Sequence, residues 1–198
     1  MTWKQSDSRH LERALLALGR GERTASGEPS GMSELYDLMA QAILTTAYVI
    51  TGNREDAEDV LQDTLIEIML DAHLYRPRTN PRAWVLTVAR HTALDAVRRR
   101  NRRATVSEEA AFHMPAPSDT EGEFTALWDM LAMLKPEERE IIVLRLYHCL
   151  SYIEIAETLH VSVAAAQKRY QRAIDKLREY HGIAPRNAPS PSRKENKP

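Results

Sequence analysis

The chain has 198 residues, of which 43% are hydrophobic, 28% charged and only 6% aromatic, and its formal net charge is −1. This length allows one ordinary domain or two small ones, and the scarcity of aromatic residues disfavours a strand-rich barrel or sandwich. No run of 18 apolar residues occurs, which excludes a membrane-spanning helix. The single cysteine, Cys149, excludes an internal disulfide and a multi-cysteine zinc site, and the charged N-terminal residues do not resemble a secretory signal.

Helices separated by short loops are predicted along the first half of the chain. They cover about residues 11–18, 34–51, 54–73 and 81–103. The first is followed by a loop at 19–33 that contains four glycines and a proline, and we expect this loop to be mobile. Ser33 is expected to cap the second helix, and Asn80 followed by Pro81 is typical of the start of the last one.

Charge is segregated along these helices although the net charge is close to zero. Residues 54–71 contain seven acids and one base, whereas residues 76–103 contain nine arginines and one acid. A positive block of this density repels itself unless an anion neutralises it, which favours nucleic-acid binding; the alternative is a set of solvated helix faces. Two partners of opposite charge are therefore expected, and a single buried cluster that neutralised Asp59 and Arg98 would contradict this interpretation.

A second helical unit follows a segment without periodicity. Residues 104–122 are acidic and contain Pro115 and Pro117, so we interpret them as a flexible linker. Helices are then predicted over about residues 137–149, 152–159 and 163–180. The last two, joined by a short turn, are typical of a helix-turn-helix, although an ordinary helical hairpin would show the same pattern. Residues 182–198 are predicted to be disordered.

Two stretches of the chain contain different sets of short sequence motifs. Residues 35–103 contain DAEDV at 56–60, QD at 62–63, RAW at 82–84, VAR at 88–90 and LDAVRR at 94–99. Residues 127–179 contain LKPEERE at 134–140 and LSYIEIA at 150–156. In this order, and separated by a linker, the two stretches resemble regions 2 and 4 of the sigma-70 family, in its small extracytoplasmic-function (ECF) branch.

The resemblance implies an all-α protein of two small helical domains joined by the flexible acidic linker. Residues 34–103 would form a region 2-like helical bundle. Residues 123–181 would form a region 4-like helix-turn-helix domain. Residues 1–33 would be an N-terminal segment with a short helix and the mobile loop.

The resemblance also implies three binding surfaces. The acidic helix would dock on the clamp coiled coil of the largest subunit of core RNA polymerase through Asp56, Asp59, Gln62, Asp63 and Glu67. The arginine-rich helix and the loop before it would bind the promoter minus-10 element, where one base leaves the stack, through Arg78, Thr79, Asn80, Arg82, His91, Arg98, Arg99, Arg100, Arg102 and Arg103. The last helix would read the minus-35 element in the major groove through Ala164, Ala165, Gln167, Lys168, Gln171 and Arg172. Region 4 would also contact the flap of the second-largest subunit.

The sequence departs from the family pattern at two of these surfaces. His91 stands where many relatives place an asparagine near the flipped base. Residues 164–166 are alanines where relatives often have Gly-Thr-Val, and alanine offers a methyl group but no hydrogen bond. We therefore predict weak direct readout of the minus-35 element, with Lys168 and Arg172 serving mainly the backbone. The acidic linker resembles the segment that leads toward the RNA exit channel, where its charge would mimic nucleic acid.

The implied function is a non-catalytic initiation subunit that brings bacterial core RNA polymerase to promoters and helps to open the duplex. No nucleotide-binding or hydrolase motif occurs in the sequence, and no cofactor or metal is expected. The implied location is the bacterial cytoplasm, with nucleoid association in the holoenzyme, and an anti-sigma factor is a candidate partner. The alternative is a sigma-like mimic or a helix-turn-helix regulator that binds a partner protein or DNA without recruiting polymerase.

Overall fold

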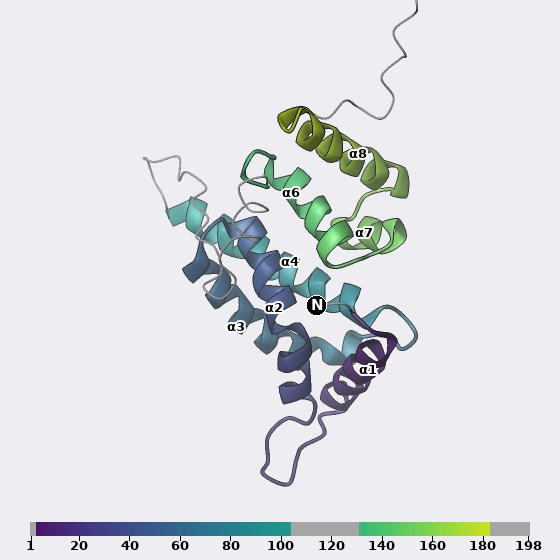
Figure 1. The fold of residues 1–198 in the computed structure, drawn as a ribbon. Coiled ribbons are helices and arrows are strands. Elements are labelled where there is room, and N and C mark those ends of the chain that lie inside the picture. Colours follow the sequence, from purple (N-terminus) through teal and green to yellow (C-terminus); the bar gives the residue numbers. More distant parts are fainter. Residues whose placement is uncertain (1–2, 104–130, 183–198) are drawn as a thin grey trace, which may run out of the picture.

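The computed structural model describes residues 3–103 and 131–182, in which the regular structure is helical apart from one isolated bridge between Arg23 and Pro29. The first half contains α1 (Gln5–Gly19), α2 (Met32–Thr51), α3 (Arg54–Asp71), the 3-10 helix η1 (Ala72–Leu74) and α4 (Pro81–Arg103). The second half contains α6 (Pro136–Ile142), the π-helical segment η2 (Val143–Tyr147), α7 (Tyr152–Leu159) and α8 (Val163–Tyr180) (Figure 1). The all-α prediction is confirmed, while the predicted linker at 104–122 and nearly all of the predicted tail lie outside the described residues.

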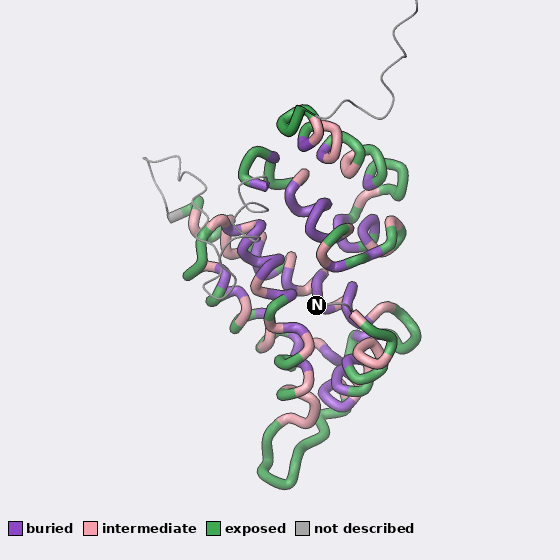
Figure 2. The backbone as a smooth tube through the Cα atoms, in the orientation of Figure 1, coloured by how far each residue is buried: buried purple, intermediate pink, exposed green. Residues whose placement is uncertain are grey.

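Helices α2, α3 and α4 pack against one another to form the first domain. Their inward faces are completely buried at positions such as Leu35, Ile43, Ile68 and Leu86, and Figure 2 shows the buried sides of the helices meeting inside the bundle. The boundary between α2 and α3 follows from local chemistry. Gly52 ends α2 in the left-handed conformation (φ 68°), and the side chain of Asn53 then accepts a hydrogen bond from a backbone N–H of the first turn of α3.

Helix α1 is longer than predicted and is part of this domain. It begins at Gln5 rather than near residue 11, and it packs against α2, η1 and α4. The next helix begins at Met32 with Gly31 as its N-cap, so the prediction that Ser33 caps it was wrong. Gly31 has a φ of 92°, and a Cβ atom there would lie 2.6 Å from the carbonyl oxygen of Ala14. Only glycine allows α1 to approach the start of α2 this closely.

In the described part of the second domain, α6 and η2 precede a helix-turn-helix formed by α7 and α8. The side chain of Ser151 caps α7 and that of Ser162 caps α8, each by accepting a hydrogen bond from a backbone N–H of the first turn. The turn between them contains His160 in the left-handed conformation (φ 52°). The predicted single helix at 137–149 is instead α6 followed by η2, which ends at Tyr147 because the chain reverses at Cys149 (φ 57°).

The two domains lie against each other. Helix α7 contacts α4, and α6 contacts α2, so that α6 and α7 cover one side of the first domain (Figure 1). We call this the closed arrangement. Nothing in the sequence analysis predicted it, and it determines which of the expected site residues are accessible.

Candidate nucleic-acid interface

The predicted polymerase-binding side chains lie on one side of α3. A groove between α3 and the C-terminal part of α4 is lined by four of these side chains: Asp56, Asp59, Gln62 and Asp63. Glu67 lies one turn further along, where it accepts a hydrogen bond from the hydroxyl of Thr92 on α4. Asp59, Gln62, Asp63 and Glu67 are all exposed, so the sequence-based grouping of these residues on one accessible face agrees with the structure.

The opposite wall of this groove carries two of the predicted DNA-binding arginines. Arg100 donates to Asp56 at 2.6 Å, and Arg99 donates to Asp63 at 3.3 Å. The four side chains retain 36% to 50% of their accessible surface, so these are surface ion pairs worth about 1 kcal/mol or less each. The acidic and basic helices thus touch, but they do not form the buried cluster that would contradict separate partners.

The remaining basic side chains at the end of α4 point to solvent. Arg98 and Arg102 are exposed, and Arg98 forms an ion pair with Asp95 one turn earlier on the same helix. The side chain of Arg103 lies outside the described residues. A row of exposed arginines on one helix is a suitable surface for a phosphate backbone, because each guanidinium can donate to phosphate oxygens without first leaving a buried partner.

The loop before α4 and the first turns of that helix hold the other predicted minus-10 residues. Arg78 and Thr79 are exposed in the loop. Asn80 is the N-cap of α4, since its side-chain oxygen accepts from the backbone N–H groups of Arg82 and Ala83 at 2.9 and 3.2 Å. Its amide nitrogen donates to Glu154 of the second domain at 2.5 Å, so in the closed arrangement Asn80 is a structural link as well as a candidate DNA contact.

The predicted recognition residues of α8 all lie on its outward face. They are Ala164, Ala165, Gln167, Lys168, Gln171 and Arg172, and every one is exposed. The inward face is held by Ala166, Ala173 and Leu177, which are buried. This helix therefore presents a continuous accessible surface, with Gln171 donating to Asp175 at 2.8 Å.

Two comparisons of the sequence agree with this arrangement of a helical bundle followed by a helix-turn-helix. The family model for sigma-70 region 2 matches residues 35–103, and the model for sigma-70 region 4 matches residues 124–177. The chain belongs to the sigma-70 family. It is 31% identical to the ECF RNA polymerase sigma factor SigE of Mycolicibacterium smegmatis over 186 residues (88% of this chain, 72% of SigE). It is 32% identical to the RNA polymerase sigma factor CarQ of Myxococcus xanthus over 165 residues (81% of this chain, 95% of CarQ).

Solved structures show the same fold. The sigma factor RpoE of Bartonella quintana, in complex with the anti-sigma factor NepR, has a TM-score of 0.66 and 22% identity, covering 76% of this chain and 96% of RpoE. CnrH, in complex with the cytosolic domain of CnrY, has a TM-score of 0.62 and 22% identity, covering 87% of this chain and 97% of CnrH. The family models and the relatives SigE and CarQ, together, show that the chain is a promoter-recognising sigma factor of the ECF type. Among its described helices, none is long and apolar enough to cross a bilayer.

The closed arrangement of this sigma factor is held by a buried histidine of the second domain. His148 is 2% exposed and lies between α2 and α4. Arg82 donates to its Nδ1 at 3.0 Å, and because guanidinium nitrogens only donate, Nδ1 carries no proton. The Nε2–H therefore donates to the hydroxyl of Thr46 at 2.9 Å, and that hydroxyl donates to the carbonyl of Ala42. Burial, together with the nearby Arg82 charge, lowers the pKa of His148 to about 3.

Arg82 itself is not accessible in this arrangement. Its side chain is 7% exposed, and its guanidinium lies over the indole of Trp3 at 4.5 Å from the ring centroid. Burial lowers the pKa of Arg82, although a guanidinium remains protonated in any physiological range. A residue that the family resemblance placed at the minus-10 element is thus enclosed between Trp3, which precedes α1, and His148 of the second domain.

Further along α4, three polar pairs join the domains. Arg90 donates to Glu140 at 2.6 Å, and the two side chains retain only 15% and 9% of their surface. Burial raises the pKa of Glu140, against the opposing effect of Arg90. The Nε2 atoms of His91 and His160 are 3.1 Å apart with their rings nearly parallel, and Thr87 donates to Thr158 at 3.2 Å. Burial and the neighbouring His160 lower the pKa of His91.

Sequence reasoning missed Glu140 and His148, although a weak signal exists. Both are polar residues inside the mainly apolar stretch at 140–150, where a helical core segment would place apolar side chains. A buried polar group needs a specific partner, so such residues indicate a contact that lies elsewhere in the fold.

Proposed function

We propose that this sigma factor holds core RNA polymerase through the acidic face of α3 and promoter DNA through α4, the loop before it, and α8. The observation that carries the proposal is that exposed acidic side chains lie on α3 and exposed basic side chains lie on α4. Asp59 and Gln62 are exposed on one wall of the α3–α4 groove, while Arg98 and Arg102 are exposed on the other helix. Opposite charges steer a basic coiled coil and a phosphate backbone to different helices of one small domain.

Promoter binding by Asn80, Arg82 and His91 requires that the second domain move away. In the closed arrangement each of them bonds a residue of that domain: Glu154, His148 and His160. A side chain cannot make these bonds and contact DNA through the same atoms. We therefore propose that the closed arrangement is the free protein and that the two domains separate in the holoenzyme.

We further propose an anti-sigma factor as a partner, and contact of the second domain with the flap of the second-largest subunit. Support for the first comes from the solved structures of similar fold, which are those of sigma factors bound to NepR and to the cytosolic domain of CnrY. Membership of this family supports a non-catalytic role in the bacterial cytoplasm, with nucleoid association in the holoenzyme. The polymerase, and not this chain, would perform nucleotidyl transfer.

Run-off transcription with core RNA polymerase on a promoter library tests the proposal. Promoter-selective transcripts are expected only when the protein is present. Asp59→Lys should weaken core binding, and Arg102→Glu should leave core binding intact but weaken promoter binding. Glu22→Lys, which makes the same charge change as Asp59→Lys at an exposed site outside the α3 face, is the matched control. Polymerase binding without promoter selectivity would instead identify a sigma-like mimic.

A further inference from the structure

The N-terminal helix α1 contacts the loop that precedes α4. The carboxylate of Glu12 accepts a hydrogen bond from the backbone N–H of Arg78 at 2.8 Å, across 66 residues of sequence. It also accepts from the hydroxyl of Tyr75 at 3.3 Å. Burial raises the pKa of Tyr75 to about 12, so this hydroxyl keeps its proton and remains a donor. One side chain of α1 thus binds two points of a loop that carries candidate promoter contacts.

The contact occurs where the loop adopts an uncommon backbone conformation. Arg78 has a φ of 69°, in the left-handed region that side chains other than glycine, asparagine and aspartate rarely adopt. A charge-assisted hydrogen bond to its N–H is among the stronger bonds available to hold such a turn. Within the loop, Thr79 donates to the carbonyl of Arg76 at 2.7 Å, and Tyr75 also lies within hydrogen-bond distance of the Thr79 carbonyl.

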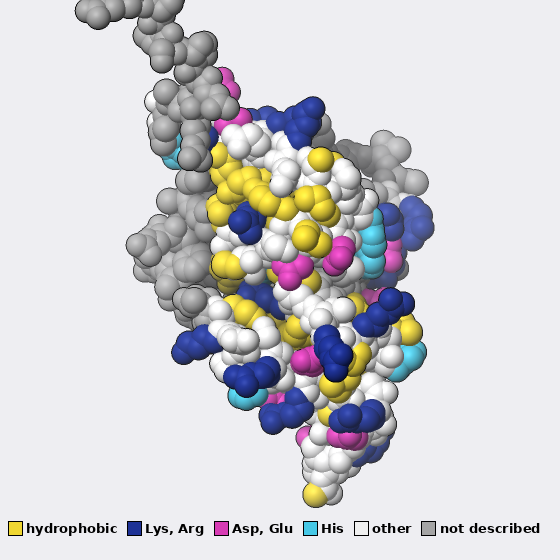
Figure 3. Space-filling view, turned by 90° about the vertical axis from the view of Figure 1, so that its right-hand side faces the viewer, with side chains coloured by type: hydrophobic (Ala, Val, Ile, Leu, Met, Phe, Trp, Pro, Cys, Tyr) yellow, Lys and Arg dark blue, Asp and Glu magenta, His cyan; other side chains and the backbone are white. Residues whose placement is uncertain are grey.

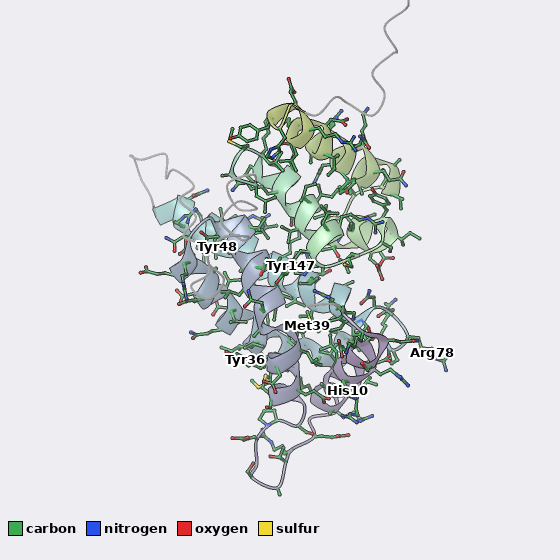
Figure 4. The ribbon with its side chains drawn as sticks, in the orientation of Figure 1. His10, Tyr36, Met39, Tyr48, Arg78 and Tyr147 are labelled. Atoms are coloured by element: carbon green, nitrogen blue, oxygen red, sulfur yellow. The ribbon has the colours of Figure 1, made fainter. Side chains whose placement is uncertain are left out.

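The same loop forms one wall of a pocket. Arg76, Thr79 and Asn80 line it together with the indole of Trp84, which packs edge-on against Tyr75 at 5.7 Å between ring centroids. The opposite wall is formed by Glu154, Glu157 and Thr158 of α7, so the pocket lies between the two domains in the closed arrangement. Figure 4 places Arg78 at the outer edge of the loop, with His10 of α1 on the adjacent helix. Figure 3 shows lysine and arginine side chains spread over the lower half of this face of the molecule.

We propose that Glu12 is a positioning residue for promoter recognition: from α1 it fixes the left-handed turn at Arg78 and thereby sets where Arg78 and Thr79 meet the minus-10 bases. The inference rests on the proposed function, because it assumes that this loop contacts the minus-10 element. It assigns a role to the N-terminal helix beyond packing. Glu12 acts through the loop backbone and itself contacts no DNA.

The structure supplies a conservative variant and a matched control. Glu12→Gln keeps a side-chain oxygen that can accept from the Arg78 N–H, whereas Glu12→Ala removes it. Glu34→Ala removes another glutamate that ties α1 down, through the ion pair with Arg13 at 3.1 Å, but this glutamate lies on α2 and does not touch the loop. A merely structural role of α1 would make the two alanine variants behave alike.

Holoenzymes assembled with each variant are tested on promoters that carry every single-base change in the minus-10 element, and core affinity is measured separately. Glu12→Ala should reduce discrimination between the preferred and the substituted bases by about tenfold, with core affinity unchanged. Glu12→Gln and Glu34→Ala should retain discrimination. Equal loss of transcription on all promoters in Glu12→Ala and Glu34→Ala would overturn the inference.

Amide hydrogen exchange of the full free chain separates this inference from the proposed function. Exchange at Arg78 should become about tenfold faster in Glu12→Ala and stay unchanged in Glu34→Ala, whether or not the loop binds DNA. Unchanged protection of Arg78 in Glu12→Ala would overturn the inference while leaving the proposed function intact. Faster exchange combined with an unmodified holoenzyme that shows no minus-10 selectivity would overturn the proposed function and, with it, the recognition role of Glu12.

Discussion

Acidification should open the closed arrangement through His148. In that arrangement Nδ1 accepts from Arg82, so a proton added there would face a guanidinium N–H inside a buried site. When the domains separate, His148 is released to solvent and its pKa returns toward the ordinary value of 6.5. Protons therefore bind more readily to the open form, and the closed form is favoured less as the pH falls below 6.5.

The size of this effect follows from the two pKa values. With a pKa of about 3 in the closed form and 6.5 in the open form, lowering the pH from 7.5 to 5 shifts the equilibrium by about 2 kcal/mol toward opening. This corresponds to a change of about thirtyfold in the equilibrium constant. The pKa of His91 is also lowered in the closed arrangement, by burial and the neighbouring His160, so protonation of His91 likewise favours opening.

Fluorescence energy transfer between the two domains measures the opening. Dyes are placed at Glu55→Cys on α3 and Lys168→Cys on α8, which are exposed positions, in a Cys149→Ser background. Transfer should fall between pH 7 and 5 in this chain. The His148→Gln variant lacks this titratable group, so its response to the pH should be smaller. An identical pH response with and without His148 would refute the reasoning.

Substitutions at three other sites test the packing and the helix caps. Arg90→Met leaves Glu140 buried without its partner, so it should weaken the closed arrangement by about 3 kcal/mol, measured by the same energy transfer at pH 7.5. Gly31→Ala places a Cβ atom against the Ala14 carbonyl at a φ that alanine rarely adopts, and it should destabilise the first domain by about 2 kcal/mol or more in thermal unfolding. Asn53→Ala removes the α3 cap and should cost about 1 kcal/mol in urea unfolding, whereas Asn53→Asp should cost much less. An unchanged midpoint in Gly31→Ala or in Asn53→Ala would contradict the role assigned to that residue.

Local signals in the sequence predicted most of the helices and the exposed faces of α3 and α8, but not the start of α1 or the N-cap of α2. Asn53, Ser151 and Ser162 each cap the helix that follows them, because a side-chain oxygen before an apolar-periodic segment meets the free N–H groups of the first turn. The alternation of buried alanines with exposed polar residues on α8 follows from its period in the same way.

The contacts that determine accessibility could not be predicted in this manner. Arg82 looked like a DNA contact from its place in a motif, yet it lies between Trp3 and His148, residues that are far from it in the sequence. Glu12 gave no signal at all, because its partner is a backbone N–H whose conformation no pattern in the sequence reveals. Long-range pairs of polar groups depend on the assembled fold rather than on local spacing.

The outward face of α8 remains fully accessible while Arg82 is enclosed. In the closed arrangement, one DNA-binding surface is therefore accessible and part of the other is buried. The protein's encounters with a chromosome would then begin upstream, through the helix-turn-helix alone, and only a later rearrangement would commit the first domain to the start site. In that order, promoter search and promoter opening would be separate steps carried out by the two domains of one small protein.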